Sequence, residues 1–137
     1  MNKALPPLCL ASLMLLGCAQ MEDDKVFRKL GGPVGVSVAL GYLAVDEEPI
    51  HRRTSDRAAV VFHLAHDTES ADFKFPAEGA VTFTPPTVDF DCRTTNDRTV
   101  VCTRSRLNTS KYKYTIRVVR RGTGTDPDPL DPFIITH

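Results

Sequence analysis

Two residue types in this chain, cysteine and histidine, could do chemistry by their kind and spacing. Cys92 and Cys102 stand in the stretch DFDCRTTNDRTVVCTR, with nine residues between them. Such a pair can ligate a metal, form a redox couple or form a structural disulfide. A zinc site would need four ligands at tighter spacing, and no Cys-x-x-Cys occurs in the chain. The neighbouring residues alone do not decide the matter, because the compartment controls cysteine chemistry.

The second candidate is HLAHD, with His63, His66 and Asp67. Positions three apart on a strand point to opposite faces, so we expect the two imidazoles to diverge and to meet water, without a metal site. The chain has no Gly-x-Ser-x-Gly, no phosphate-cradling glycine loop and no His-Glu-x-x-His. We therefore expect no catalytic residues, no cofactor and no enzyme activity.

The compartment is indicated by the first residues of the chain. A single Lys3 precedes an apolar run at residues 4–16, which is too short to cross a bilayer because a spanning helix needs about 20 residues. A short apolar segment behind one positive charge is typical of a secretory signal peptide, here residues 1–17.

This leader ends in LLGC, that is Leu15, Leu16, Gly17 and Cys18. The motif resembles the lipobox of bacterial lipoproteins. The resemblance implies cleavage before Cys18 and acylation of its thiol, with palmitate a typical chain. Two or three acyl chains make such an anchor effectively permanent, since each buried methylene contributes about 0.8 kcal/mol. Ala19 stands where an aspartate would favour the inner membrane, which implies the periplasmic face of the outer membrane.

The lipoprotein resemblance also bears on the cysteines. If Cys9 leaves with the leader and Cys18 carries lipid, Cys92 and Cys102 remain as one pair in an oxidising compartment, and we expect a disulfide. Both flanking segments predict strands, and Asn-Asp-Arg between them predicts a turn at residues 96–98. In that register Thr95 faces Thr99 and Cys92 faces Cys102.

The remaining chain is long enough for one domain. We expect a lipidated tether at residues 18–32 and a folded domain at residues 33–137. Residues 33–45 alternate, which predicts one strand with Val34, Val36, Val38, Leu40 and Tyr42 on its buried face. Residues 46–57 read as a polar loop, and FIIT near the end of the chain reads as the last strand. Seven or eight short strands predict an all-β, antiparallel β-sandwich, with a small barrel as the alternative.

The hairpin FDCRTTNDRTVVCT followed by the alternating YKYTIRVV resembles parts of bacterial immunoglobulin-like domains, over about residues 80–121. The chain departs from the pattern of antibody domains in two ways. It has no tryptophan to pack on the disulfide, and its expected disulfide lies within one hairpin and not between two sheets. The resemblance implies a sandwich and carries no function.

Charge is concentrated in one segment, because residues 92–121 carry nine basic side chains and one acidic one. Lys111, Lys113 and Arg117 share the outward face of the strand expected there, and such a face could contact anionic headgroups, glycan polymers or an acidic envelope protein. Nucleic acid is not an expected partner. We expect an envelope lipoprotein with a binding or structural role. Two alternatives stay open: an inhibitor of an envelope-active hydrolase that docks the loop HDTESADFKF, or a subunit of an envelope-spanning assembly that pairs an edge strand with its partner.

Overall fold

The structure is a computed structural model that describes residues 32–137, and these residues form one compact unit. Within them lie eleven β-strands, one 3-10 turn and no α-helix. The strands are β1 (Val34–Ala39), β2 (Tyr42–Val45), β3 (Ile50–Arg52), β4 (Val60–Leu64), β5 (Phe73–Lys74), β6 (Val81–Phe83), β7 (Phe90–Asn96), β8 (Thr99–Arg104), β9 (Ser110–Ile116), β10 (Val119–Arg120) and β11 (Phe133–Thr136), and the turn is η1 (Ser70–Asp72). The expected lipobox, Cys18 and most of the expected tether lie outside these residues.

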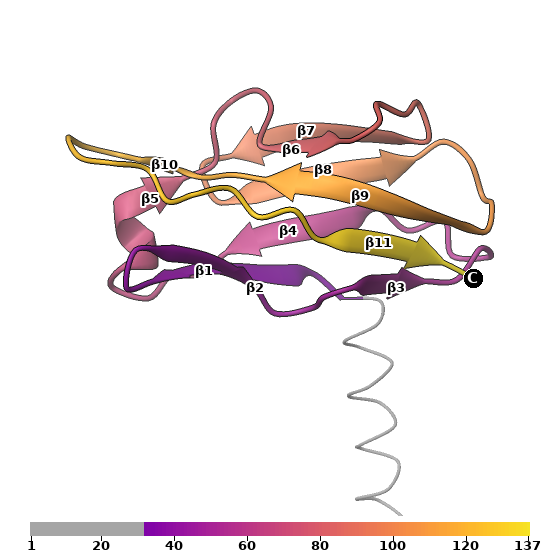
Figure 1. Cartoon of the computed structure of the whole chain (residues 1–137), viewed down its shortest axis with the longest axis horizontal. Helices are drawn as coiled ribbons and strands as arrows, with labels where there is room; N and C mark the ends of the chain where they lie inside the picture. The colour runs from indigo at the N-terminus through magenta and orange to yellow at the C-terminus, as the bar shows by residue number, and fades with distance from the viewer. Residues whose placement is uncertain (1–31) are drawn as a thin grey trace, which may run out of the picture. The chain divides into compact units, whose positions relative to one another are not determined.

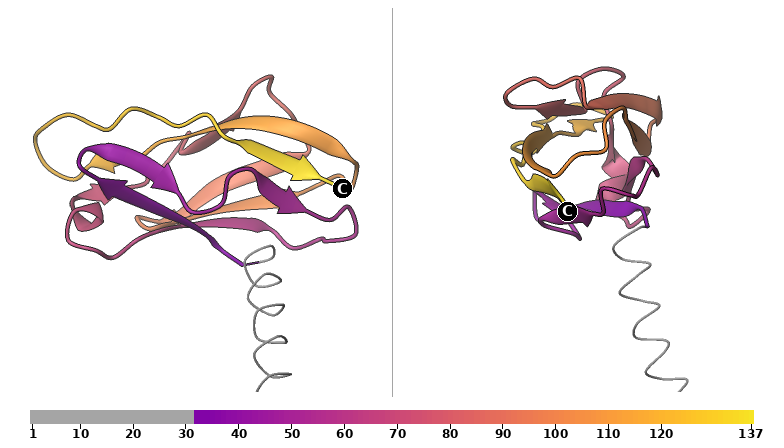
Figure 2. Two further views of the ribbon diagram at one scale, coloured as in Figure 1. Left: turned by 60° about the horizontal axis from the view of Figure 1, so that its bottom comes forward. Right: turned by 90° about the vertical axis from the view of Figure 1, so that its right-hand side faces the viewer.

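The strands form two main sheets packed as a sandwich (Figure 1). One sheet has the order β2-β1-β4-β8-β7 and the other the order β3-β11-β9-β6, while β10 and β5 form a separate pair. Two further views show the same layers, which do not close into a barrel (Figure 2). The predicted all-β sandwich is confirmed.

The sheets are mixed, although the sequence pattern predicts antiparallel ones. β1 pairs with β4, and β3 with β11, in parallel. The described residues also contain more strands than the expected seven or eight, because several segments of two to four residues join the sheets. Segments this short show too little alternation to stand out in the sequence.

The core between the sheets is built from alternate residues of the longer strands. Val34, Val36 and Val38 of β1 are buried, as are Tyr114 and Ile116 of β9. This is the alternation that the sequence predicts, since successive side chains of a strand point to opposite faces.

The expected single strand at residues 33–45 is wrong, because the chain reverses at Leu40 and Gly41. Both residues have positive φ, 53° and 80°, as the tight turn of a two-residue hairpin requires. The reversal takes Leu40 and Tyr42 out of the core, and they are 89% and 75% exposed. The alternating pattern runs through this turn because Gly41 falls where a small outward residue is expected.

The polar loop expected at residues 46–57 is also partly wrong, because it contains β3. Ile50 and Arg52 of this strand are buried, and β3 pairs with β11 near the other end of the chain. Figure 1 shows β11 between β3 and β9, so the apolar segment predicted as the last strand is an inner strand of its sheet.

Candidate functional site

The cysteine pair lies on the β7–β8 hairpin and forms a disulfide, with an S–S distance of 2.04 Å. Cys92 stands directly opposite Cys102 and Arg93 opposite Val101, as predicted. The predicted turn is wrong in detail. Asn96, not Thr95, pairs with Thr99, because a β-bulge shifts the register after Thr94 and leaves a two-residue turn. Cys102 is fully buried, and the bridge therefore crosslinks two strands at the edge of the core.

Arg98, in that turn, fastens the hairpin to the segment between β4 and β5. Its guanidinium donates hydrogen bonds to four backbone carbonyl oxygens, those of Leu64, Ala65, Ser70 and Phe73. Only a planar side chain with several donors can serve four acceptors at once. From the sequence this arginine is expected only as a turn residue, because its four acceptors lie 25 to 34 positions away and the local sequence carries no signal of them.

The segment held by Arg98 includes η1, where Asp67 accepts hydrogen bonds from the backbone N–H and the hydroxyl of Ser70, both at 2.9 Å. These bonds lower the pKa of the Asp67 carboxyl. The buried Ser70 hydroxyl also accepts a hydrogen bond from the N–H of Val38 in β1. The segment expected as a docking loop is thus tied to β1 and to the turn of the β7–β8 hairpin.

The basic residues predicted on one face occupy two places. Lys111 and Lys113 of β9 are exposed on the outer side of their sheet, next to Phe133 of β11. The Lys111 ammonium lies 4.2 Å from the centre of the Phe133 ring, a cation–π contact. We call Lys111, Lys113 and Phe133 the outer β9 face. Arg117 follows the end of β9, and its guanidinium donates to the carbonyl oxygens of Glu78 and Gly79.

A groove of about 230 Å³ runs beside the outer β9 face. It is lined by Phe83, Thr84, Pro85, Pro86, Thr87 and residues 110–113. Tyr112 is one of its lining residues, and its hydroxyl lies 2.7 Å from an Asp89 carboxylate oxygen. Burial and this carboxylate raise the pKa of Tyr112, so its hydroxyl stays a hydrogen-bond donor. The groove therefore adjoins both lysines and has an apolar wall of Phe83, Pro85 and Pro86.

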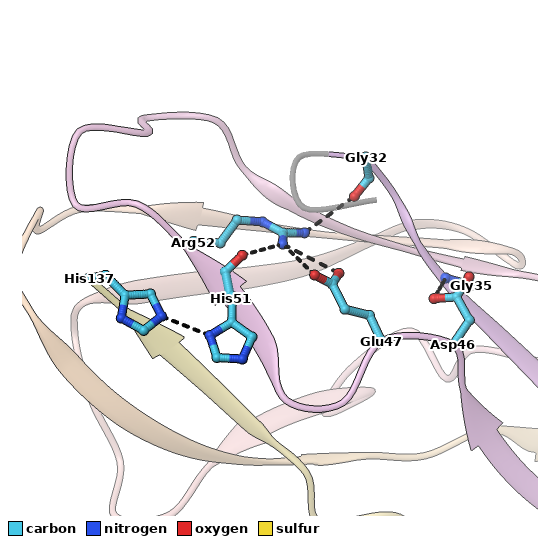
Figure 3. A network of polar contacts seen from close by, with 7 residues as sticks. All are labelled: Gly32, Gly35, Asp46, Glu47, His51, Arg52 and His137. Atoms are coloured by element: carbon cyan, nitrogen blue, oxygen red, sulfur yellow. Dashed lines mark hydrogen bonds and ion pairs between the residues drawn. The ribbon is translucent and has the colours of Figure 1, made fainter. Parts of the chain in front are cut away.

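The four histidines lie in two pairs, which the sequence does not predict. The rings of His63 and His66 lie against each other with centroids 5.3 Å apart, so the predicted divergence is wrong. His66 lies beyond the end of β4, where the alternation of strand positions no longer applies. In a second pair, His51 Nδ1 lies 2.7 Å from His137 Nε2 (Figure 3).

Beside the second pair lies a buried ion pair between Arg52 and Glu47. The N–O distance is 3.0 Å, and the two side chains are 2% and 8% exposed. Arg52 also donates to the carbonyl oxygens of His51 and Gly32, so this network ties β3 to the start of the described chain (Figure 3). From the sequence Glu47 and Arg52 are expected in a polar loop, and their ion pair is not predicted, because the surfaces that bury it come from other strands.

A second groove has a volume of about 360 Å³. It is lined by residues 77–81, by Cys92, Arg93 and Thr94 of the edge strand β7, and by the buried Val100 of β8. Alternate residues of an antiparallel strand turn their backbone groups to opposite sides. Since Leu64 N–H donates to the carbonyl of Arg98, even-numbered positions of β8 face β4 and odd-numbered ones face β7. By the register of the hairpin, the backbone groups of Cys92 and Thr94 then point to the free edge.

Among residues 32–137, no cluster of three or more histidine, cysteine, aspartate or glutamate side chains is placed to hold a metal ion. No helix in the same range is long and apolar enough to cross a membrane. Comparison of the chain with protein-family models, with curated proteins and with solved structures finds no match.

Proposed function

We propose that this protein is a binding module of the bacterial envelope, anchored by lipid on Cys18 to the periplasmic face of the outer membrane. The observation that carries the proposal is the distribution of the four cysteines. One lies in the apolar leader and one in the LLGC motif, and the two others form the disulfide of the β7–β8 hairpin. A disulfide of this kind persists in an oxidising compartment, which agrees with export.

The anchor is tested by changing Cys18→Ser in the full chain and fractionating the cells. Loss of the acyl chains should move the protein from the membrane to the soluble periplasmic fraction, because a single protein surface cannot replace two or three buried chains. A Cys9→Ser variant is the matched control and should stay on the membrane. Membrane association that survives Cys18→Ser would refute the anchor.

The outer β9 face is the proposed contact surface for an anionic envelope component. Two exposed ammonium groups beside an apolar groove suit a ligand that carries both negative charge and carbon surface. Lys111→Glu with Lys113→Glu should weaken binding to anionic vesicles or acidic glycans at least tenfold at low salt. Lys74→Glu on β5, which belongs to another sheet, is the matched control.

The edge of β7 supports a second candidate function, as a subunit that pairs with an extended segment of an envelope assembly. By the hairpin register its backbone groups at Cys92 and Thr94 point to the free edge, both residues line the second groove, and strand addition to a free edge uses such groups. A crosslinked complex held by these bonds should survive high salt, whereas one held by Lys111 and Lys113 should dissociate. Retention in 1 M salt, at a Debye length of about 3 Å, therefore separates the two modes.

A further inference from the structure

The four histidines of this chain lie in two pairs, and the two pairs differ in geometry. His51 is on β3, and His137 follows β11, the strand that pairs with β3 in parallel. Eighty-six positions separate the two residues in the chain, so their meeting is a product of the fold alone.

The geometry of the pair is edge to edge. The ring planes are inclined by only 12°, and the centroids are 5.0 Å apart. Since the Nδ1–Nε2 distance is much shorter, at 2.7 Å, the two nitrogen atoms lie between the ring centres and face each other. A ring nitrogen carries its lone pair or its proton in the ring plane, so both groups are directed at one point (Figure 3).

The backbone holds both residues in place. The N–H of His137 donates to the carbonyl of Arg52 at 3.0 Å, and the N–H of Thr54 donates to the carbonyl of His137 at 2.5 Å. His51 is fixed within β3 by its pairing with Ile135. Its side chain is half-buried and that of His137 is exposed, so the site is rigid on one side and accessible on the other.

The guanidinium of Arg52, the residue after His51, does not face the pair. Side chains alternate along β3, and Arg52 points into the domain, where the Glu47 carboxylate neutralises it. His51 points to the opposite side of the strand.

We propose that His51 and His137 bind a transition-metal ion of the Zn²⁺ and Cu²⁺ class, through His51 Nδ1 and His137 Nε2. Imidazole nitrogen suits these ions among the metals available to proteins. With Zn–N bonds of about 2.0–2.1 Å and tetrahedral angles, the two nitrogens stand about 3.3 Å apart. The rings must therefore separate by roughly 0.6 Å and also tilt away from their collinear arrangement, so that both lone pairs meet at the ion. The exposed His137 ring has room for both movements.

Loading the metal moves one proton. In the free pair of neutral rings, one of the two facing nitrogens carries the hydrogen of the bond. When the metal takes its place, this hydrogen leaves to water and another binds the outer nitrogen of the same ring. Both rings are then neutral ligands, and water fills the remaining two positions, which leaves the ion exchangeable.

The pair His63 and His66 provides a matched control within the same molecule. Its ring planes are inclined by 56°, and His63 Nδ1 lies 3.4 Å from the Thr99 hydroxyl. No hydrogen bond joins a ring nitrogen of His63 to one of His66, so this pair lacks the facing nitrogens of the first pair.

The test is a titration of the full chain, without an affinity tag and with Cys9→Ser and Cys18→Ser so that no free thiol competes. Zn²⁺ alone is added and binding is followed by calorimetry. One ion should bind per chain, and His51→Ala and His137→Ala should each weaken binding at least tenfold, whereas His63→Ala should leave it unchanged. Equal loss with His63→Ala, or no loss with His51→Ala, would overturn the proposal.

A second measurement needs no substitution at the site, so it does not depend on whether the variants fold. Substoichiometric Cu²⁺ broadens the proton resonances of imidazoles that bind it. The ring protons of His51 and His137 should broaden before those of His63 and His66. Uniform broadening of all four rings, or none, would equally contradict the site.

Discussion

Arg98 is the residue on which the β7–β8 hairpin and the segment after β4 both depend. Changing Arg98→Ala removes the hydrogen bonds that four carbonyl oxygens accept from its guanidinium, and the Ser70 carbonyl keeps another, from the N–H of Phe73. Hydrogen bonds to charged groups contribute about 1.5–3 kcal/mol, so we expect a loss of about 3 kcal/mol in the free energy of unfolding, measured by urea denaturation. Arg106→Ala is the control, because that side chain is 67% exposed and should change stability by less than about 0.5 kcal/mol.

Tyr114 carries a hydroxyl in the core that has no hydrogen-bond partner among residues 32–137. A buried group without a partner costs about 1–3 kcal/mol, so Tyr114→Phe should raise the free energy of unfolding by about 1 kcal/mol. Tyr112→Phe is the control and should lower it, since the Tyr112 hydroxyl bonds to Asp89. A destabilised Tyr114→Phe variant would show that the hydroxyl is satisfied.

Tyr114 also makes the stability of the domain depend on pH in alkaline solution. Burial, reinforced by the charges of Glu48 and Glu47, raises the pKa of Tyr114 far above its usual value. The unfolded chain then releases the phenol proton near pH 10 while the folded chain keeps it, so stability is full below pH 10 and falls as pH rises above it. Comparing unfolding at pH 9 and pH 11 should show a steeper fall for the wild type than for Tyr114→Phe.

At the scale of elements, the β1–β2 hairpin depends on a contact from outside it. The Glu69 carboxylate accepts hydrogen bonds from the N–H groups of Leu40, at 2.8 Å, and Gly41, at 3.0 Å. Glu69→Ala should therefore destabilise the domain by about 1 kcal/mol, because the contact is exposed to solvent. Hydrogen exchange should quicken at Leu40 and Gly41 in this variant. Glu78→Ala, an exposed change in another turn, should affect neither readout.

At the scale of the whole molecule, β11 joins the two ends of the described chain. It lies between β3 and β9, and its Ile134 is fully buried. Ile134→Ala should cost about 2–5 kcal/mol and be detected as a lower midpoint of urea unfolding. Its neighbour Ile135 is only half-buried on the outer face, so Ile135→Ala should cost clearly less. Equal effects would mean that β11 does not sit at the core as described.

Local patterns in the sequence determined several strands of this protein and the register of the hairpin that carries its disulfide. Alternating side chains identify β9 and its buried face, because the period of a strand is two residues and depends only on neighbours in the chain. The apolar run FIIT identifies β11. The spacing of Cys92 and Cys102 identifies their register for the same reason, since a hairpin pairs residues that are close in sequence.

Only the tertiary structure decided the rest, because the partners lie far apart in the chain. β3 is a strand only through its pairing with β11, and Glu47 and Arg52 are an ion pair only inside the closed sandwich. The hydrogen bonds from Arg98 to four carbonyl oxygens likewise join segments that are distant in the chain. So does the contact between His51 and His137. Such contacts depend on how the sheets pack, and no local period encodes that packing.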